Sequence, residues 1–281
     1  MLKMNLHFLF IVLCLAYNQN LLANWQLGTS GSSSSSSQSQ SLRVSQTFFD
    51  QHKLTLNTSN GKLTSDTVDQ ESSSLKLSYR WKYSSDLKLT AQLNQMDEYN
   101  LFTSQGYGFK LQKSILAGDL HSTISIGIDS SNKQYSNYSQ LSLGQKQISI
   151  GYEIDITENL NLNMNYSSFQ YQTESQIINR RLNGSSIIFS EINSYVSGLV
   201  VSSMALGFDY IMNDLTTSFG FSVDRTDPAT PLRSIGQSLQ FDYNINEDLN
   251  LGLGLTRSKE LGTTTTSDSM NWSLSYQFPN Y

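Results

Sequence analysis

The chain has 281 residues, a formal net charge of −5 and 38% hydrophobic residues, so it can form one large domain or two small ones. Only 15% of its residues are charged, below the usual ~25%. A weakly acidic chain with no basic run gives no case for a nucleic-acid partner. The mean hydropathy of −0.34 excludes a bundle of transmembrane helices.

The chain begins with the pattern of a secretory signal peptide. Lys3 precedes an almost entirely apolar run over 6–16, which is too short to cross a bilayer as a helix. We expect residues 1–23 to be this signal peptide, with cleavage after Ala16 or after Ala23. Cys14 is the only cysteine, so the mature chain has no disulfide and no thiol nucleophile.

Residues 24–41 contain the run SGSSSSSSQSQS. Such a low-complexity composition cannot bury a core and predicts a flexible segment ahead of the folded domain. The alternative is that this segment folds back into the interior of that domain.

A repeated unit follows, in which two alternating strands flank a short polar turn. In the copy at 239–256, apolar residues alternate with polar ones on both sides of the turn Asn246-Glu247-Asp248. Further copies lie at 75–93, 148–166 and 206–223. A period of two around a short turn predicts β-hairpins with one apolar face and one polar face.

We count about twelve strands between 42 and 278, of which the first runs from about 42 to 56 and is followed by a polar, loop-like stretch over 57–72. Ten or fourteen remain open because of a change of phase between Leu143 and Ile148 and because of the apolar residues at 187–189. The change of phase predicts a β-bulge.

The lengths of the strands and loops distinguish a membrane barrel from a soluble sandwich. The strands run to about ten residues, enough to cross a bilayer at a tilt, whereas sandwich strands average about five or six. Short and long connections alternate, and aromatic residues gather where strands enter the short turns. These residues predict an aromatic girdle: Trp81, Tyr83, Tyr152, Tyr210, Tyr243, Tyr276 and Phe278.

We therefore expect residues 42–281 to form an all-β domain, a closed antiparallel transmembrane β-barrel. Closure is required because every backbone group in lipid must be paired internally. A secreted soluble β protein is the alternative.

In these features the chain resembles the outer-membrane β-barrel proteins of Gram-negative bacteria. The last strand, NWSLSYQF, resembles the C-terminal signal that the barrel-assembly machinery reads, with aromatic Tyr276 and Phe278. It departs from that signal at Ser273 and in the three residues after Phe278. The resemblance implies localisation in the bacterial outer membrane, with lipid and the assembly machinery as partners.

If the apolar residues face lipid, their polar neighbours line a lumen. One wall is then basic, with Lys76, Arg80, Lys82, Lys88 and Lys110. The facing wall is acidic, with Asp129, Glu153, Asp155, Asp209, Asp224 and Asp242. The alternative is that these groups pair across a narrow or filled lumen.

The function that we predict from this lumen is a porin-like channel for passive diffusion of small polar solutes. The alternative is a non-transporting structural or surface-interaction barrel whose long loops, above all 172–194, bind a partner protein.

We expect no enzyme. The outer-membrane phospholipase arrangement needs a histidine with a serine two residues on, and here Thr123 follows His121 at that spacing. No Cys/His cluster suggests a metal, and no cofactor is expected.

Overall fold

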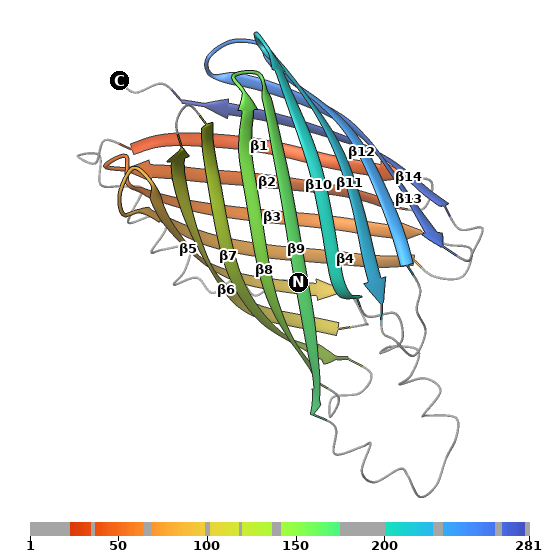
Figure 1. The fold of residues 1–281 in the computed structure, drawn as a ribbon. Helices are drawn as coiled ribbons and strands as arrows, with labels where there is room; N and C mark the ends of the chain where they lie inside the picture. The colour runs from red at the N-terminus through yellow and green to blue at the C-terminus, as the bar shows by residue number, and fades with distance from the viewer. Residues whose placement is uncertain are drawn as a thin grey trace, which may run out of the picture.

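The computed structural model describes residues 23–34, 37–64, 69–98, 102–117, 120–136, 142–174, 200–226, 233–261 and 266–278. They form fourteen strands in one closed sheet, in which neighbours in sequence are neighbours in space and β1 pairs with β14 (Figure 1). The closed all-β barrel is thus confirmed, with fourteen strands. No helix within these ranges is long and apolar enough to cross a membrane.

The strands vary from 12 to 16 residues. They are β1 (Ala23–Ser34), β2 (Ser37–Phe48), β3 (His52–Thr64), β4 (Asp69–Lys82), β5 (Leu87–Glu98), β6 (Phe102–Ala117), β7 (Leu120–Tyr135), β8 (Ser142–Thr157), β9 (Leu160–Glu174), β10 (Val200–Met212), β11 (Leu215–Thr226), β12 (Arg233–Asn244), β13 (Leu249–Leu261) and β14 (Thr266–Gln277).

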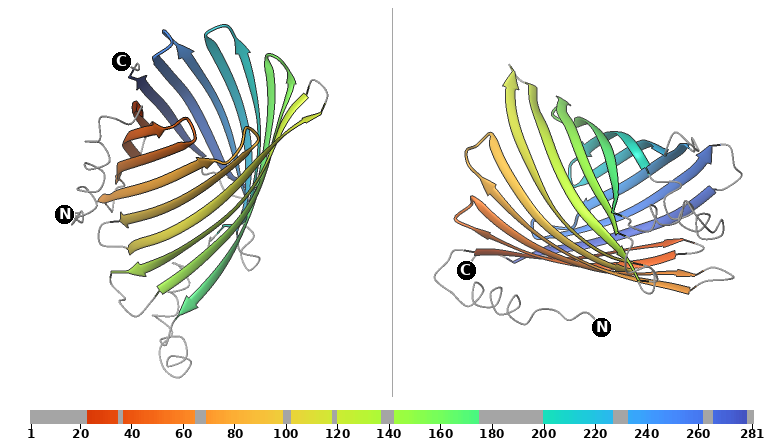
Figure 2. Two further views of the ribbon diagram at one scale, coloured as in Figure 1. Left: turned by 90° about the vertical axis from the view of Figure 1, so that its left-hand side faces the viewer. Right: turned by 90° about the horizontal axis from the view of Figure 1, so that it is seen from below.

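The barrel closes where the first strand meets the last. β1 pairs antiparallel with β14 from Gln26 opposite Gln277 to Ser34 opposite Ser269. The amide of Phe278 extends this ladder by donating to the Trp25 carbonyl at 2.8 Å. Figure 2 shows the first and last strands next to one another in the closed wall. The sheet therefore has no free edge.

The Ser-rich segment at 24–41 is not a separate flexible segment. It forms β1 and the first part of β2, so the barrel begins at Ala23 and not at 42. The composition argument failed because these strands are held by backbone pairing with a neighbour on each side, which needs no apolar side chains. Serine pairs stabilise the hairpin instead: the hydroxyls of Ser30 and Ser41 are 2.6 Å apart. Residues 1–22, with most of the expected signal peptide, lie outside the described residues.

The second additional strand comes from a turn with no sequence signature. The stretch 42–56 was expected to be one strand, but it contains the ends of β2 and β3 around a turn. Phe49 and Asp50 have φ values of 51° and 57° there. Glycine and asparagine are the residues that usually mark such left-handed positions. A phenylalanine at this position therefore does not predict a turn.

The predicted bulge between Leu143 and Ile148 is wrong. β8 keeps an unbroken register with β9 from Ser142 to Asp155, and the shift lies between Asp155 and Thr157. The phase changes because Leu143, only 1% exposed, turns to the inner face. The apolar residues at 187–189 lie outside the described residues.

The barrel exposes its apolar side chains, whereas a soluble domain buries them. On β13, Leu251, Leu253 and Leu255 are exposed, whereas Gly252 and Gly254 between them are buried. Among the described residues, the buried hydrophobic ones are Phe102, Tyr135 and Leu143. The apolar surface is thus turned outward, as lipid contact requires.

Candidate functional site

The strand register divides the side chains between the two faces of the wall. Directly paired residues share a face, so a face can be followed from strand to strand. One row is polar or glycine from β1 to β8 and runs through Gln26, Ser45, Thr55, Ser78, Gln92, Gly108, Asp129 and Gln147. The adjacent row is mostly apolar and runs through Trp25, Gln46, Leu54, Tyr79, Ala91, Phe109, Ile128 and Ile148. The first row lines the lumen.

The expected basic residues all fall on this inner face. They lie on β4 (Lys76, Arg80 and Lys82), β5 (Lys88) and β6 (Lys110). Two further cations join them, Arg43 on β2 and Lys53 on β3. The sequence does not point to either residue as long as 42–56 is taken as a single strand, because the turn between β2 and β3 lies inside that stretch. The sequence signal for them is the alternation around Val44 and Leu56. These two residues are apolar and face outward, so Arg43 and Lys53, which are an odd number of residues away, face inward.

Two pairs of cations on this wall face each other directly. Lys53 on β3 pairs with Arg80 on β4, and Lys82 on β4 pairs with Lys88 on β5. The Lys53 ammonium donates to Gln26 Oε1 at 3.0 Å. Like charges in opposed positions destabilise a sheet, so this part of the wall is under electrostatic strain.

The expected acidic residues also lie on the inner face, along β7 to β12. Neutral donors on the same wall hold them. The Asn161 amide donates to Glu153 at 3.2 Å and to Asp155 at 2.8 Å. Asn163 donates to Asp209.

The remaining acidic residues follow the same arrangement. Ser234 donates to Asp224 and Gln240 to Asp242. Gln92 reaches Asp129 across β6, where Gly108 provides no side chain to keep them apart. A neutral hydrogen bond orients a carboxylate without cancelling its charge.

Among the described residues, no ion pair joins the two walls. The pairs found are His121 with Asp155, 3.5 Å apart on neighbouring strands, and Arg257 with Asp268 on the outer face. In a ring of fourteen, β4 lies opposite β11. The basic and acidic walls therefore face each other across the barrel with their charges largely unpaired.

A third arc of the lumen is neutral and built from small residues. β13 and β14 present Gly252, Gly254 and Ser273 inward, and the β1–β2 hairpin presents Ser30 and Ser41. The two glycines are buried. Short side chains leave this part of the lumen wide, so the Ser-rich run forms part of the inner wall.

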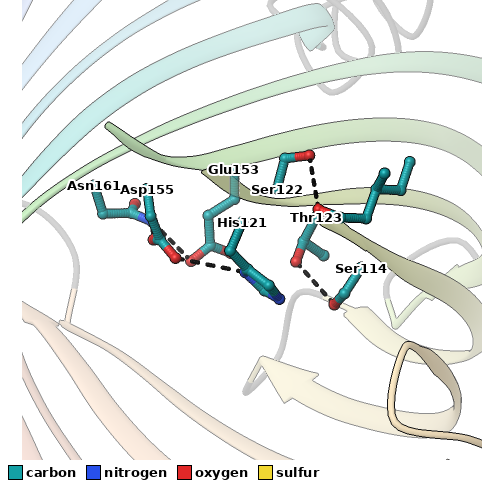
Figure 3. Close-up of polar contacts among 8 residues, drawn as sticks. Ser114, His121, Ser122, Thr123, Glu153, Asp155 and Asn161 are labelled. Atoms are coloured by element: carbon teal, nitrogen blue, oxygen red, sulfur yellow. Dashed lines mark hydrogen bonds and ion pairs between the residues drawn. The ribbon is translucent and has the colours of Figure 1, made fainter. Parts of the chain in front are cut away.

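His121 lies on β7 beside Glu153, Asp155 and Asn161 of the neighbouring strands, near the short turns (Figure 3). Its Nδ1 faces Asp155, but the nearby hydroxyls have other partners. Thr123 Oγ1 is 3.1 Å from Ser114 Oγ, and Ser122 donates to the Ile115 carbonyl. The hydroxyl contacts of this cluster thus do not include a nucleophile bonded to the histidine, the arrangement that acyl transfer needs.

The aromatic residues expected to form a girdle are exposed. Most lie within two residues of a short turn, whereas Tyr152 lies further along β8. Trp81 and Tyr83 meet edge to face with ring centroids 5.3 Å apart, as do Tyr276 and Phe278 at 4.9 Å. His52 stacks on Trp81 in the same region.

No protein-family model and no curated protein matches the chain. Among solved structures, it is similar to CdiB from Acinetobacter baumannii, with a TM-score of 0.53 and 10% identity over 91% of this chain and 60% of CdiB. A KdgM porin aligns over 90% of this chain and 99% of its own, with a TM-score of 0.45 and 9% identity. The outer membrane protein opdK from Pseudomonas aeruginosa aligns over 91% and 98%, with a TM-score of 0.49 and 7% identity. At these identities the likeness concerns the fold, and the chain shares the barrel architecture of CdiB.

Proposed function

We propose that the chain is a porin-like channel of the bacterial outer membrane through which small polar solutes diffuse passively. The observation that carries this proposal is the lack of ion pairs between the basic and acidic walls in the described part of the chain. A filled barrel would join such charges directly, because burying an unpaired charge is costly. Water between the walls accounts for the unpaired charges.

The outer surface supports a membrane location. Apolar side chains cover the outer face of successive strands, including Ile126, Ile150, Phe208 and Leu253, each at least 39% exposed. Exposing so many large apolar groups to water would be unfavourable, whereas a closed barrel in lipid places them favourably. The aromatic residues near the short turns fit one interface of that membrane.

The size of the barrel also supports a passage. Barrels of eight strands are filled by their own side chains, and barrels of sixteen enclose an aqueous channel. Fourteen strands are close to the second case. The opposed walls would orient dipolar solutes and water, and screening over ~8 Å at physiological salt confines this field to the lumen.

The test is ion conductance of the full chain in planar bilayers. The folded protein is first identified by a shift in migration between unboiled and boiled samples. We expect discrete conductance steps from the folded fraction and none from the boiled one.

Folded protein that stays silent would refute the channel and favour the alternative, a barrel that acts through partner-binding loops. Contact of the C-terminal strand with the barrel-assembly machinery is part of the proposal; the described end of that strand, with exposed Tyr276 and Phe278, supports it.

A further inference from the structure

The geometry points to a binding site for multivalent oxyanions, carboxylates or phosphates, on the basic wall near the short turns. The site consists of Lys53, Arg80, Lys82 and Lys88, which we call the cation quartet. This inference rests on the proposed function, because it names the class of solute that such a lumen would retain.

The quartet is compact because the register brings its members together. Lys53 is opposite Arg80, and Lys82 is opposite Lys88. Arg80 and Lys82 are two residues apart on β4 and so lie on the same face. Opposed residues have Cβ atoms about 5 Å apart, and alternate residues along a strand are about 7 Å apart. The four charges therefore form a zigzag across three strands, with Arg80 and Lys82 on β4 between Lys53 on β3 and Lys88 on β5.

Among the described residues no ion pair reaches the quartet, and Asp86, in the turn between Lys82 and Lys88, accepts from the Ser84 hydroxyl. The inward residues paired with Lys88 and Arg80 on β6 and β5 are Gln112 and Thr90. Gln26, which accepts from Lys53, is also uncharged. The inward carboxylate on the strands of the quartet, Glu98, lies at the other end of β5 from Lys88, and the acidic wall lies on β7 to β12.

The other cations of the basic wall are arranged differently. Lys76 is opposite Asn57 and Asn94, and Lys110 is opposite Thr90 and Gly127. Neither is directly opposite another cation, although Lys110 is diagonal to Lys88. Among the described inward residues, cations face each other directly only within the quartet, and only an anion with more than one charged group can contact both opposed pairs at once.

Arg80 and the lysines provide complementary contacts for such an anion. A guanidinium can hold a carboxylate or phosphate through two parallel hydrogen bonds, and ammonium groups provide point charges that adapt to either. Arg80 and Lys82 are exposed to the lumen side of the wall, so a solute can reach them.

The experiment measures inhibition of potassium chloride conductance by citrate, inorganic pyrophosphate and acetate at matched ionic strength. We expect citrate and pyrophosphate to reduce the current at much lower concentrations than acetate. The two multivalent probes also show whether the site prefers carboxylate or phosphate. Lys82→Gln and Arg80→Gln should each weaken this inhibition about tenfold, the usual effect of losing one charged hydrogen bond.

Lys76→Gln is the matched control because it removes one cation from the same wall, at a position with no cation opposite or diagonal to it. It should weaken the inhibition by citrate much less than Lys82→Gln. Equal effects of the two variants, or equal potency of citrate and acetate, would overturn the site and leave the channel in place.

Calorimetric titration of the folded, detergent-solubilised protein with citrate separates the site from the channel. Binding that is lost in Lys82→Gln, in a protein that does not conduct, would support the quartet and refute the channel. An absence of binding in a protein that conducts would refute the quartet alone. Both variants relieve repulsion and should fold as well as the wild type, which the boiling-dependent shift in migration verifies.

Discussion

The indole of Trp272 lies directly over Gly31 at the closure of the barrel. A Cβ atom on Gly31 would be 2.7 Å from Trp272 Nε1 and 2.9 Å from the Ser39 carbonyl oxygen. The two residues are opposed in the β1–β14 register. The large ring therefore covers a point where β1 has no side chain, and the glycine allows the close approach.

Gly31→Val should destabilise the barrel, because the new side chain would displace both the ring and the β2 backbone. Overpacking of this kind costs about 1–3 kcal/mol. Urea unfolding followed by tryptophan fluorescence measures it. Gly28→Ala is the control: its nearest contact, the Leu274 carbonyl oxygen, is 3.5 Å away. Equal losses in the two variants would contradict the role of Trp272.

An arginine on the outer face should cost far more than one on the inner face at the same height. Leu253→Arg places a charge in the apolar surface, for which we expect a loss of about 2–4 kcal/mol if this surface lies near the bilayer midplane. Gln240→Arg is the control. The register pairs Phe241 with Leu253 and Gln240 with Gly254, so both positions are level, but Gln240 faces the lumen beside Asp242.

The measurement is the free energy of unfolding of both variants in lipid vesicles. The control should lose little stability, since its new cation lies near the acidic wall. A near-neutral effect of Leu253→Arg would mean that the leucine faces water.

The hairpins with strict alternation could be predicted from the sequence because each has an apolar face to define its phase. Leu251, Leu253 and Leu255 fix the outward side of β13 and, with it, the lumen-facing side. This is why the acidic and basic positions of β4 to β12 could be assigned to one face without a structure.

The remaining strands have two polar faces, and alternation then carries no signal. Backbone pairing with the neighbouring strands is what makes two such stretches β-strands: the C-terminal part of β3, from Thr58 to Lys62, and the run from Ser37 to Ser41 in β2. Composition predicted loops or a tail there. The basic wall predicted from the sequence lacked Lys53 of the cation quartet for a related reason. Lys53 lies just after the turn at Phe49 and Asp50, and the residues of that turn do not mark it as one.

The transverse field of the lumen should set ion selectivity in opposite directions for the two walls. The double variant Lys76→Gln/Lys110→Gln should shift the reversal potential towards cation preference. Glu153→Gln/Asp209→Asn should shift it towards anion preference. The measurement is the zero-current potential across a bilayer in a potassium chloride gradient.

Salt distinguishes this field from a change of pore shape. The Debye length falls from ~10 Å at 0.1 M to ~3 Å at 1 M salt, so both shifts should decrease as the salt concentration rises. Arg257→Gln on the outer face is the control and should leave selectivity unchanged. Shifts in the same direction for both walls would contradict the assignment.

The turn between β4 and β5 should contribute a pH-dependent stability through Asp86. The Ser84 hydroxyl donates to Asp86 Oδ1 at 2.6 Å. This bond, followed by a backbone hydrogen bond and the charge of Lys113, lowers the pKa of the Asp86 carboxyl below its ordinary value. A pKa that is lower in the folded state means that the ionised form stabilises the fold.

The sign of this effect gives the last prediction. The contribution is present above the unfolded-state pKa of about 3.9 and disappears as the pH falls through the lower pKa of the folded state. Asp86→Asn should therefore reduce the free energy of unfolding at neutral pH, and its difference from the wild type should shrink in acid. Ser84→Ala removes the main cause of the lowered pKa, so this variant should lose the larger part of this pH dependence while keeping the carboxylate. Urea unfolding of the three proteins over a pH series measures it, and a difference for Asp86→Asn that stays constant into acid would mean that the carboxylate charge has no part in holding the turn.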